Sequence, residues 1–347
     1  MSYKQMTGNI ISATKVEPAG KVIVSAASGV WNLQDQYDYR RGNNWPSTDN
    51  AVPTALVAGG NINIATIDQF VIATDGNATD FGDLTVGRGL SSGAGSDTRF
   101  IVVGGDVSNT SNVTIDFTTY SSGGTFSDFG DTNVRFSTGN NSPVSNNTRS
   151  CFALSRQDGD NTTTQNNISY ITNASAGDAT DFGNTSVARN GVAGLSSTTR
   201  GIFAGGFYKD GSTFVFLNTI DYITIGSTGN AADFGDLTAN KNQSGGCASS
   251  TRGLIAGGGG LNVIEYITIA SAGNGTDFGD LRATGYGNVA LADLTKAVIT
   301  VYADGSSVDE IDKVTIATLG NAADFGDLTT IRTYPCGGSS VAASVQS

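Results

Sequence analysis

One tripeptide, Asp-Phe-Gly, occurs six times in the chain at nearly even spacing. The copies begin at Asp80, Asp128, Asp181, Asp233, Asp277 and Asp324, so the intervals are 48, 53, 52, 44 and 47 residues. When the copies are aligned on the Phe, each has Ile fourteen residues earlier and Gly five residues earlier, with no insertion between these positions. Such strict spacing indicates one hairpin per copy, and the period is longer than that of ankyrin or TPR repeats.

The fifth copy, residues 262–281, shows what one hairpin requires. Ile264–Ile269 is rich in β-branched and aromatic residues and therefore predicts a strand. Gly273 and Asn274 tolerate positive φ, so the chain reverses there. Phe278 then lies on the returning strand, where Gly279 allows another backbone to approach closely.

Two further strands precede each hairpin. One ends in paired glycines, as in Arg252–Gly258, and before it comes a strand of small residues, as in Gly191–Ser197. Four strands per repeat of this length predict a β-propeller with small side chains on the strand nearest the axis. Residues 53–84 supply only three strands, and Cys336–Ala343 supplies a fourth. We therefore predict an all-β, six-bladed propeller at residues 51–347, closed by its C-terminal strand so that no sheet edge is left open.

The repeat resembles the kelch repeat, in which a strand ending in Gly-Gly is followed by a Tyr strand and an aromatic anchor. Tyr170, Tyr222 and Tyr266 match the kelch Tyr, and Phe117 replaces it in the second blade. Gln69 and Lys313 depart from the pattern, the third blade lacks Gly-Gly, and Phe replaces the kelch Trp throughout. The resemblance therefore implies a divergent kelch-like propeller.

The repeated Phe residues are predicted to fill the space between neighbouring blades. At about 1.5–3 kcal/mol for each buried aromatic side chain, six of them contribute much of the adhesion between blades. A kinase function for Asp-Phe-Gly is excluded because no phosphate loop or catalytic-loop motif accompanies it. These blade anchors are Phe81, Phe129, Phe182, Phe234, Phe278 and Phe325.

Composition argues against catalysis and against several classes of partner. The chain has no His, which removes the commonest general base and metal ligand. A glycosidase would need a carboxylate pair, but no sialidase Asp-box is present. Asp158-Gly-Asp160 and Asp304-Gly305 do not continue into a calcium loop, and the three cysteines have no metal-ligand spacing. We therefore expect no enzymatic activity, no cofactor and no metal.

The formal net charge of −12 argues against a nucleic-acid partner, which would need clustered Lys and Arg. No apolar run approaches the ~20 residues of a membrane span, and the N-terminus has no signal-peptide core. We therefore expect neither a nucleic-acid partner nor a membrane span, and we expect synthesis in a cytoplasm.

Arginine recurs after Thr at the start of the Gly-Gly strand, as Arg99, Arg149, Arg200 and Arg252. We expect these side chains to contact a repeat Asp at the same end of the blade. The alternative is a ring that binds anions.

Insertions in the third and fourth blades supply the candidate binding loops, because binding residues gather on loops held by a rigid scaffold. The aromatic residues of the second insertion form either a small local core or a contact surface. The candidate residues are Arg156, Asp158 and Asp160 in the first loop, and Phe207, Tyr208, Phe214 and Phe216 in the second.

Residues 1–50 lie outside the repeat and contain both tryptophans. A segment this short does not readily form a hydrophobic core of its own. We therefore interpret it as an extended arm that docks onto a partner. The predicted contact residues are Trp31, Leu33, Tyr37, Tyr39 and Trp45.

Residues 27–46, with Ser28-Gly-Val-Trp31 and Trp45-Pro46, resemble a module of tailed-bacteriophage virion proteins, and the repeat resembles structural proteins of marine phages. The resemblance implies a tail-fibre or tail-associated virion protein. Its partners would be other virion proteins through residues 1–50, a host surface receptor or glycan, and further copies of the chain. Two alternatives remain: a capsid-attached fibre or decoration protein, and a cellular kelch-type protein-binding scaffold.

Overall fold

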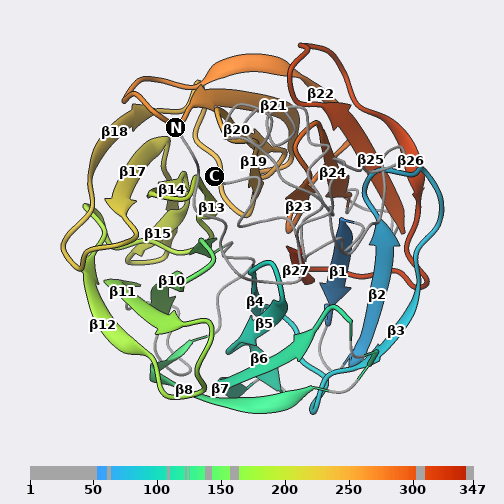
Figure 1. Cartoon of the computed structure of the whole chain (residues 1–347). Helices are drawn as coiled ribbons and strands as arrows, with labels where there is room; N and C mark the ends of the chain where they lie inside the picture. Colours follow the sequence, from blue (N-terminus) through green and yellow to red (C-terminus); the bar gives the residue numbers. More distant parts are fainter. Residues whose placement is uncertain are drawn as a thin grey trace, which may run out of the picture. The chain divides into compact units, whose positions relative to one another are not determined.

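The structure, a computed structural model, describes residues 53–60, 64–107, 110–121, 123–124, 126–136, 143–156, 164–301 and 309–340. In these ranges six four-stranded antiparallel sheets are arranged around one axis (Figure 1). The predicted six-bladed propeller is confirmed.

The first three blades include the one that closes the ring. From the axis outward, blade 1 consists of β27 (Cys336–Ser339), β1 (Thr54–Ala58), β2 (Thr66–Val71) and β3 (Thr79–Asp83). Blade 2 consists of β4 (Ser92–Gly95), β5 (Arg99–Val103), β7 (Thr110–Thr119) and β8 (Ser127–Phe136), and the short β6 (Asp106–Val107) pairs with the start of β7. Blade 3 consists of β9 (Val144–Ser145), β10 (Arg149–Arg156), β11 (Thr164–Thr172) and β12 (Thr180–Asn184).

The other three blades repeat this order, and one of them carries an added hairpin. Blade 4 consists of β13 (Ala193–Ser196), β14 (Arg200–Ala204), β17 (Thr219–Thr224) and β18 (Ala232–Asp236), with β15 (Phe207–Asp210) and β16 (Thr213–Phe216) as a separate hairpin between β14 and β17. Blade 5 consists of β19 (Gly245–Ala248), β20 (Arg252–Ala256), β21 (Leu261–Thr268) and β22 (Thr276–Gly285). Blade 6 consists of β23 (Val289–Ala292), β24 (Lys296–Thr300), β25 (Glu310–Thr315) and β26 (Ala323–Asp327).

Ring closure follows the predicted route. The strand at the C-terminal end of the described chain, β27, pairs antiparallel with β1, with Ala55 opposite Ser339 and Ala58 opposite Cys336. Blade 1 is therefore built from both ends of the propeller sequence, as the strand count predicts.

A β-bulge explains why Phe is followed by Gly in every repeat. In blade 4, Ile220 pairs with Gly235 and the next residue, Asp221, pairs with Asp233, so Phe234 is left unpaired. The same shift occurs in the other five blades. A bulge re-aims a side chain out of the regular alternation, and each repeat Phe is buried.

The repeated Gly pair lets neighbouring blades touch through their backbones. A Cβ on Gly235 would lie 2.6 Å from the carbonyl oxygen of Gly273 in the turn of the next blade. That turn also pairs with the outer strand, since the amide of Gly273 donates to Phe234 and the amide of Gly275 donates to Asp236, both at 2.8 Å. The turn of one blade therefore covers part of the outer strand edge of the blade before it.

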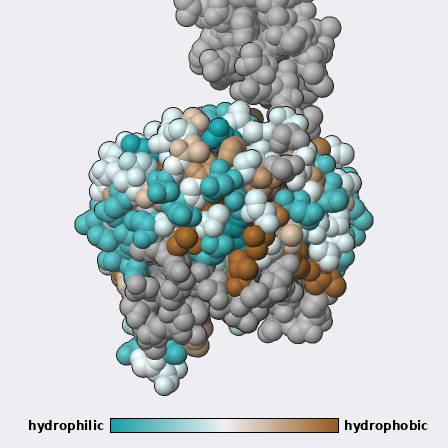
Figure 2. Space-filling model, turned by 90° about the horizontal axis from the view of Figure 1, so that it is seen from below, coloured by the Kyte–Doolittle hydropathy of each residue, from teal (hydrophilic) through white to brown (hydrophobic). Residues whose placement is uncertain are grey.

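The propeller side shown in Figure 2 is predominantly hydrophilic, and its hydrophobic residues form small separate groups. No helix in the described ranges has the length and apolar character of a membrane-spanning segment.

Candidate functional site

The six blade anchors lie in six hydrophobic clusters, each of which joins two neighbouring blades. Phe234 of blade 4, for example, packs in one cluster with Ile255 and Ile267 of blade 5. Every anchor is at most 8% exposed. Phe325 packs with Val57 and Phe70 of blade 1, so the same contact closes the ring.

The recurring arginines do not behave as expected. The Arg200 guanidinium lies 4.7 Å from the centroid of the Tyr222 ring and donates to the Ile269 carbonyl of the next blade at 2.7 Å. Arg99, Arg149 and Arg252 lie over Phe117, Tyr170 and Tyr266 in the same way, and each donates to a carbonyl of the following blade. The predicted contact with a repeat Asp is therefore wrong. An aromatic face and a carbonyl both attract the cation, so the kelch-like Tyr serves as its platform.

The acidic residue that directly follows the repeated Ile forms an ion pair with a cation that is not one of the recurring arginines. In blade 4, Asp221 is buried and forms an ion pair with Arg189 of the loop that follows β12 in blade 3, with Nη2 3.0 Å from Oδ2. Equivalent pairs across other blade boundaries are Arg332–Asp68, Arg88–Asp116, Lys241–Glu265 and Arg282–Asp312. Sequence reasoning missed these pairs, although an acid lies thirteen residues before five of the six anchors and a cation lies seven residues after four of them.

One blade boundary has a neutral version of this contact. In blade 3 the position of the acid is taken by Ser169, whose hydroxyl donates to Oδ1 of Asn133 in blade 2 at 2.8 Å. Five blade boundaries therefore carry an ion pair in the described chain, and the boundary between blades 2 and 3 carries a hydrogen bond.

The second candidate loop forms the hairpin β15–β16. Its ring contacts are mutual: the Phe207 centroid lies 5.6 Å from Phe214 and 6.3 Å from Phe216. Phe214 is 50% exposed and Phe216 is 43% exposed, whereas Phe207 and Tyr208 are half-buried. The Lys209 ammonium lies 5.8 Å above the Phe214 ring. The hairpin therefore has a small aromatic contact at its base and an exposed aromatic surface beyond it.

Residues with left-handed backbone recur before the innermost strands of five blades, and one of them lies against this hairpin. Among the described non-glycine residues, Leu90, Gln243 and Tyr334 have positive φ, and each lies two residues before an innermost strand. Gly191 and Gly287 occupy the equivalent positions in two other blades. A Cβ on Gly191 would lie 3.1 Å from Cε1 of Phe207, so the hairpin packs next to this end of the axis.

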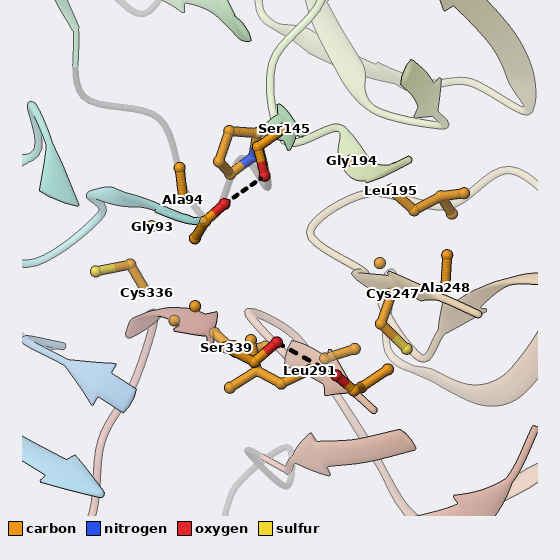
Figure 3. A pocket seen from close by; sticks show the side chains of 18 residues that line it. Gly93, Ala94, Ser145, Gly194, Leu195, Cys247, Ala248, Leu291, Cys336 and Ser339 are labelled. Carbon is orange, nitrogen blue, oxygen red and sulfur yellow. Dashed lines mark hydrogen bonds between the residues drawn. The ribbon is translucent and has the colours of Figure 1, made fainter. Parts of the chain in front are cut away.

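In the described part of the chain, a cavity of about 60 Å³ lies at the axis and is lined by the innermost strands (Figure 3). Small residues such as Gly93, Gly194 and Gly246 dominate its wall, as predicted for the strand nearest the axis. Ser145 Oγ donates to the Gly95 carbonyl, and Ser339 Oγ donates to the Ala292 carbonyl. These hydrogen bonds link innermost strands of different blades.

The three cysteines are buried. Burial raises the pKa of both Cys151 and Cys247 to about 12, and that of Cys336 to about 11. The thiols therefore stay protonated in the folded protein near neutral pH. Within the described ranges, no three His, Cys, Asp or Glu side chains are grouped so that they could hold a metal ion.

The remaining predicted residues lie outside what the structure describes. Asp158 and Asp160 are in the undescribed segment 157–163, and of Arg156 only the backbone is described, at the end of β10. The predicted arm contacts Trp31, Leu33, Tyr37, Tyr39 and Trp45 likewise lie outside the described residues, so the domain boundary after residue 50 stays a prediction.

The sequence matches no protein-family model, and comparison with curated proteins finds no similar sequence. The kelch-like and phage-like features therefore remain resemblances.

Proposed function

We propose that the chain is a structural protein of a tailed-phage virion, a tail-fibre or tail-associated component. Residues 1–50 anchor the protein to the particle, and the β15–β16 hairpin of the propeller contacts a receptor or a neighbouring subunit. The proposal rests on the resemblance of residues 27–46 and of the repeat to phage virion proteins.

The structural observation that carries the binding role is the exposed aromatic surface of β15–β16 on a closed ring. Phe214 and Phe216 keep about half of their surface exposed, whereas the six repeat Phe residues are buried. Large aromatic side chains are typical anchors of interfaces, and loops on a rigid scaffold carry binding residues. The absence of His from the sequence supports binding over general acid–base catalysis.

The anchoring role is tested with the full-length chain. A tagged chain is expressed in cells that produce phage particles, and gradient-purified particles are assayed for it by mass spectrometry. We expect the wild-type chain to copurify, and Trp31→Ala/Trp45→Ala to be lost from particles while its melting temperature stays the same. The control Val86→Ala alters an exposed apolar residue of the propeller and should copurify normally.

Normal copurification of the double variant would show that residues 1–50 are not the anchor. Absence of the wild-type chain from all particles would count against the virion assignment and favour the cellular scaffold. The position of a gold label on tail or capsid separates the tail-associated protein from the capsid-attached one.

A further inference from the structure

The outer edge of β16 offers a free strand for pairing. In the described part of the chain, β15 and β16 form a sheet of two strands, and no other strand pairs with β16. On the opposite edge, Phe207 of β15 exchanges backbone hydrogen bonds with Asn190, at 2.8 and 2.7 Å. One edge of the hairpin is therefore held by the propeller and the other is open.

The register fixes which backbone groups point outward from β16. Phe207 directs its amide and carbonyl away from the hairpin, toward Asn190, and it lies opposite Phe216. Hydrogen-bonded and non-hydrogen-bonded pairs alternate along antiparallel strands. Phe216, and Phe214 two residues before it, therefore direct their amides and carbonyls to the open edge, whereas Val215 bonds inward to Tyr208.

The open edge is complementary to a second copy of itself. The sequence Phe214-Val215-Phe216 reads the same in both directions. A two-fold axis at Val215 would place each Phe214 opposite Phe216 of the other copy in a hydrogen-bonded pair, and the two Val215 residues in a non-hydrogen-bonded pair. This alternation agrees with the outward groups of Phe214 and Phe216.

β16 differs from the outer strands of the propeller in that it carries no charged residue. The outer strands carry the repeat Asp-Phe-Gly, with an exposed Asp beside the buried Phe, and turns of the following blade pair with their edges. β16 has no charged residue, and its exposed side chains include two Phe rings. Charged residues on an edge strand prevent pairing between molecules, and β16 lacks them.

We propose that two copies of this chain associate through antiparallel pairing of their β16 strands around a two-fold axis at Val215. The product is a four-stranded sheet made of two β15–β16 hairpins, with the rings of Phe214 and Phe216 from both copies on one face. Such self-pairing is isologous and therefore stops at a dimer. It does not depend on the virion assignment.

The contact is small and the chain carries a net charge of −12, so the dimer should be weak. We expect a Kd on the order of 10–100 μM, as for interfaces at the low end of the size range. Added salt screens the repulsion between like-charged molecules, so it should strengthen the dimer. Binding driven by opposite charges would instead become weaker when salt is added.

Sedimentation equilibrium of the full chain, from about 1 to 200 μM, tests association. Phe214→Asp should weaken the dimer at least about tenfold through charge repulsion at the seam. Phe214→Pro should do the same, because it removes an outward amide while proline is tolerated on an edge strand. Leu319→Asp is the matched control, since it adds the same charge at a 55% exposed Leu between β25 and β26, outside the hairpin.

Cross-linking tests the two-fold axis directly. Opposed residues of a non-hydrogen-bonded pair have Cα atoms about 4.5 Å apart, within disulfide range. Val215→Cys should therefore form a disulfide dimer rapidly under mild oxidation, whereas Leu319→Cys should not; the native cysteines are buried.

Three results would overturn the proposal: a wild-type chain that stays monomeric across the range in high salt, equal weakening by Leu319→Asp, or equal cross-linking at both Cys positions. A mass that keeps rising past the dimer would also reject the two-fold arrangement. Unchanged melting temperatures of the variants show that folding is intact.

Discussion

Nζ of Lys241, in the loop after β18, lies 2.9 Å from Oε1 of Glu265 on β21 of the next blade, and both side chains are fully buried. The ammonium also donates to the Val263 carbonyl at 2.9 Å, and the carboxylate accepts from the Thr238 amide at 2.8 Å. Burial lowers the pKa of Lys241, although Glu265 acts in the opposite direction. The pair therefore depends on both partners being present.

Removing one partner of this ion pair should lower the free energy of unfolding far more than removing both partners. Glu265→Leu leaves a buried ammonium without its counter-charge and should lower the free energy of unfolding by about 3–5 kcal/mol, and Lys241→Met should do the same by leaving a buried carboxylate unpaired. The double variant Lys241→Met/Glu265→Leu should cost less than either single change, because no charge remains buried. Urea unfolding of the wild type, the two single variants and the double variant measures the coupling, and additive effects would show that the two side chains act independently.

The buried repeat Phe residues should contribute far more to the free energy of unfolding than the exposed Phe residues. Phe234→Ala removes a buried ring between blades 4 and 5 and should cost about 3–5 kcal/mol. Phe214→Ala removes a half-exposed ring and should change the unfolding free energy of dilute protein by no more than about 0.5 kcal/mol. Equal costs would contradict the assignment of Phe234 to the core between blades.

The backbone contact between blades can be tested with two glycines. Gly235 has φ of +148° and its Cβ would meet the Gly273 carbonyl, so Gly235→Ala should destabilise the protein by more than about 2 kcal/mol. Gly273 has no heavy atom within 4 Å of its Cβ position, so Gly273→Ala is the matched control and should cost below about 1 kcal/mol. Thermal unfolding of both variants measures the difference, and similar melting temperatures would reject the close approach as the reason for Gly235.

Loss of the closing strand should open the ring. Deleting residues from Tyr334 onward removes β27, the partner of β1, and leaves blade 1 with three strands and an exposed edge. We expect aggregation or a melting temperature lower by about 10 °C or more, since each kcal/mol shifts a large domain by a few degrees. Differential scanning calorimetry checks this, and an unchanged transition would refute the closure.

Stability should fall in alkali partly through Cys247. Burial raises its pKa from 9.0 to about 12, so the folded state favours the thiol over the thiolate. A raised folded-state pKa gives stability that is fully present below pH 9 and is lost as the pH rises toward 12. The free energy of unfolding should therefore fall less steeply for Cys247→Ala than for the wild type between about pH 9 and 11. The two slopes should differ by up to about 1.4 kcal/mol per pH unit. Parallel curves for the two proteins would show that Cys247 ionises freely in the folded state.

The sequence alone determined the blade count, the order of strands within a blade and the closure by the C-terminal strand. These follow from local, repeated features: the interval between Asp-Phe-Gly copies, the fixed distance from Ile to Phe, and the count of strands left at each end. A bulge residue such as Phe234 also carries its own local sequence signal, the Gly that follows it.

Only the tertiary structure decided what meets across the blade boundaries. Arg200 lies over Tyr222 and not beside a repeat Asp, and Asp221 pairs with Arg189 of another blade. Spacing within a repeat does not determine how far one blade is rotated and shifted against the next, and these partners depend on that packing. The β15–β16 hairpin was decided in the same way, because its pairing with Asn190 and its open edge follow from where blade 4 places an inserted loop.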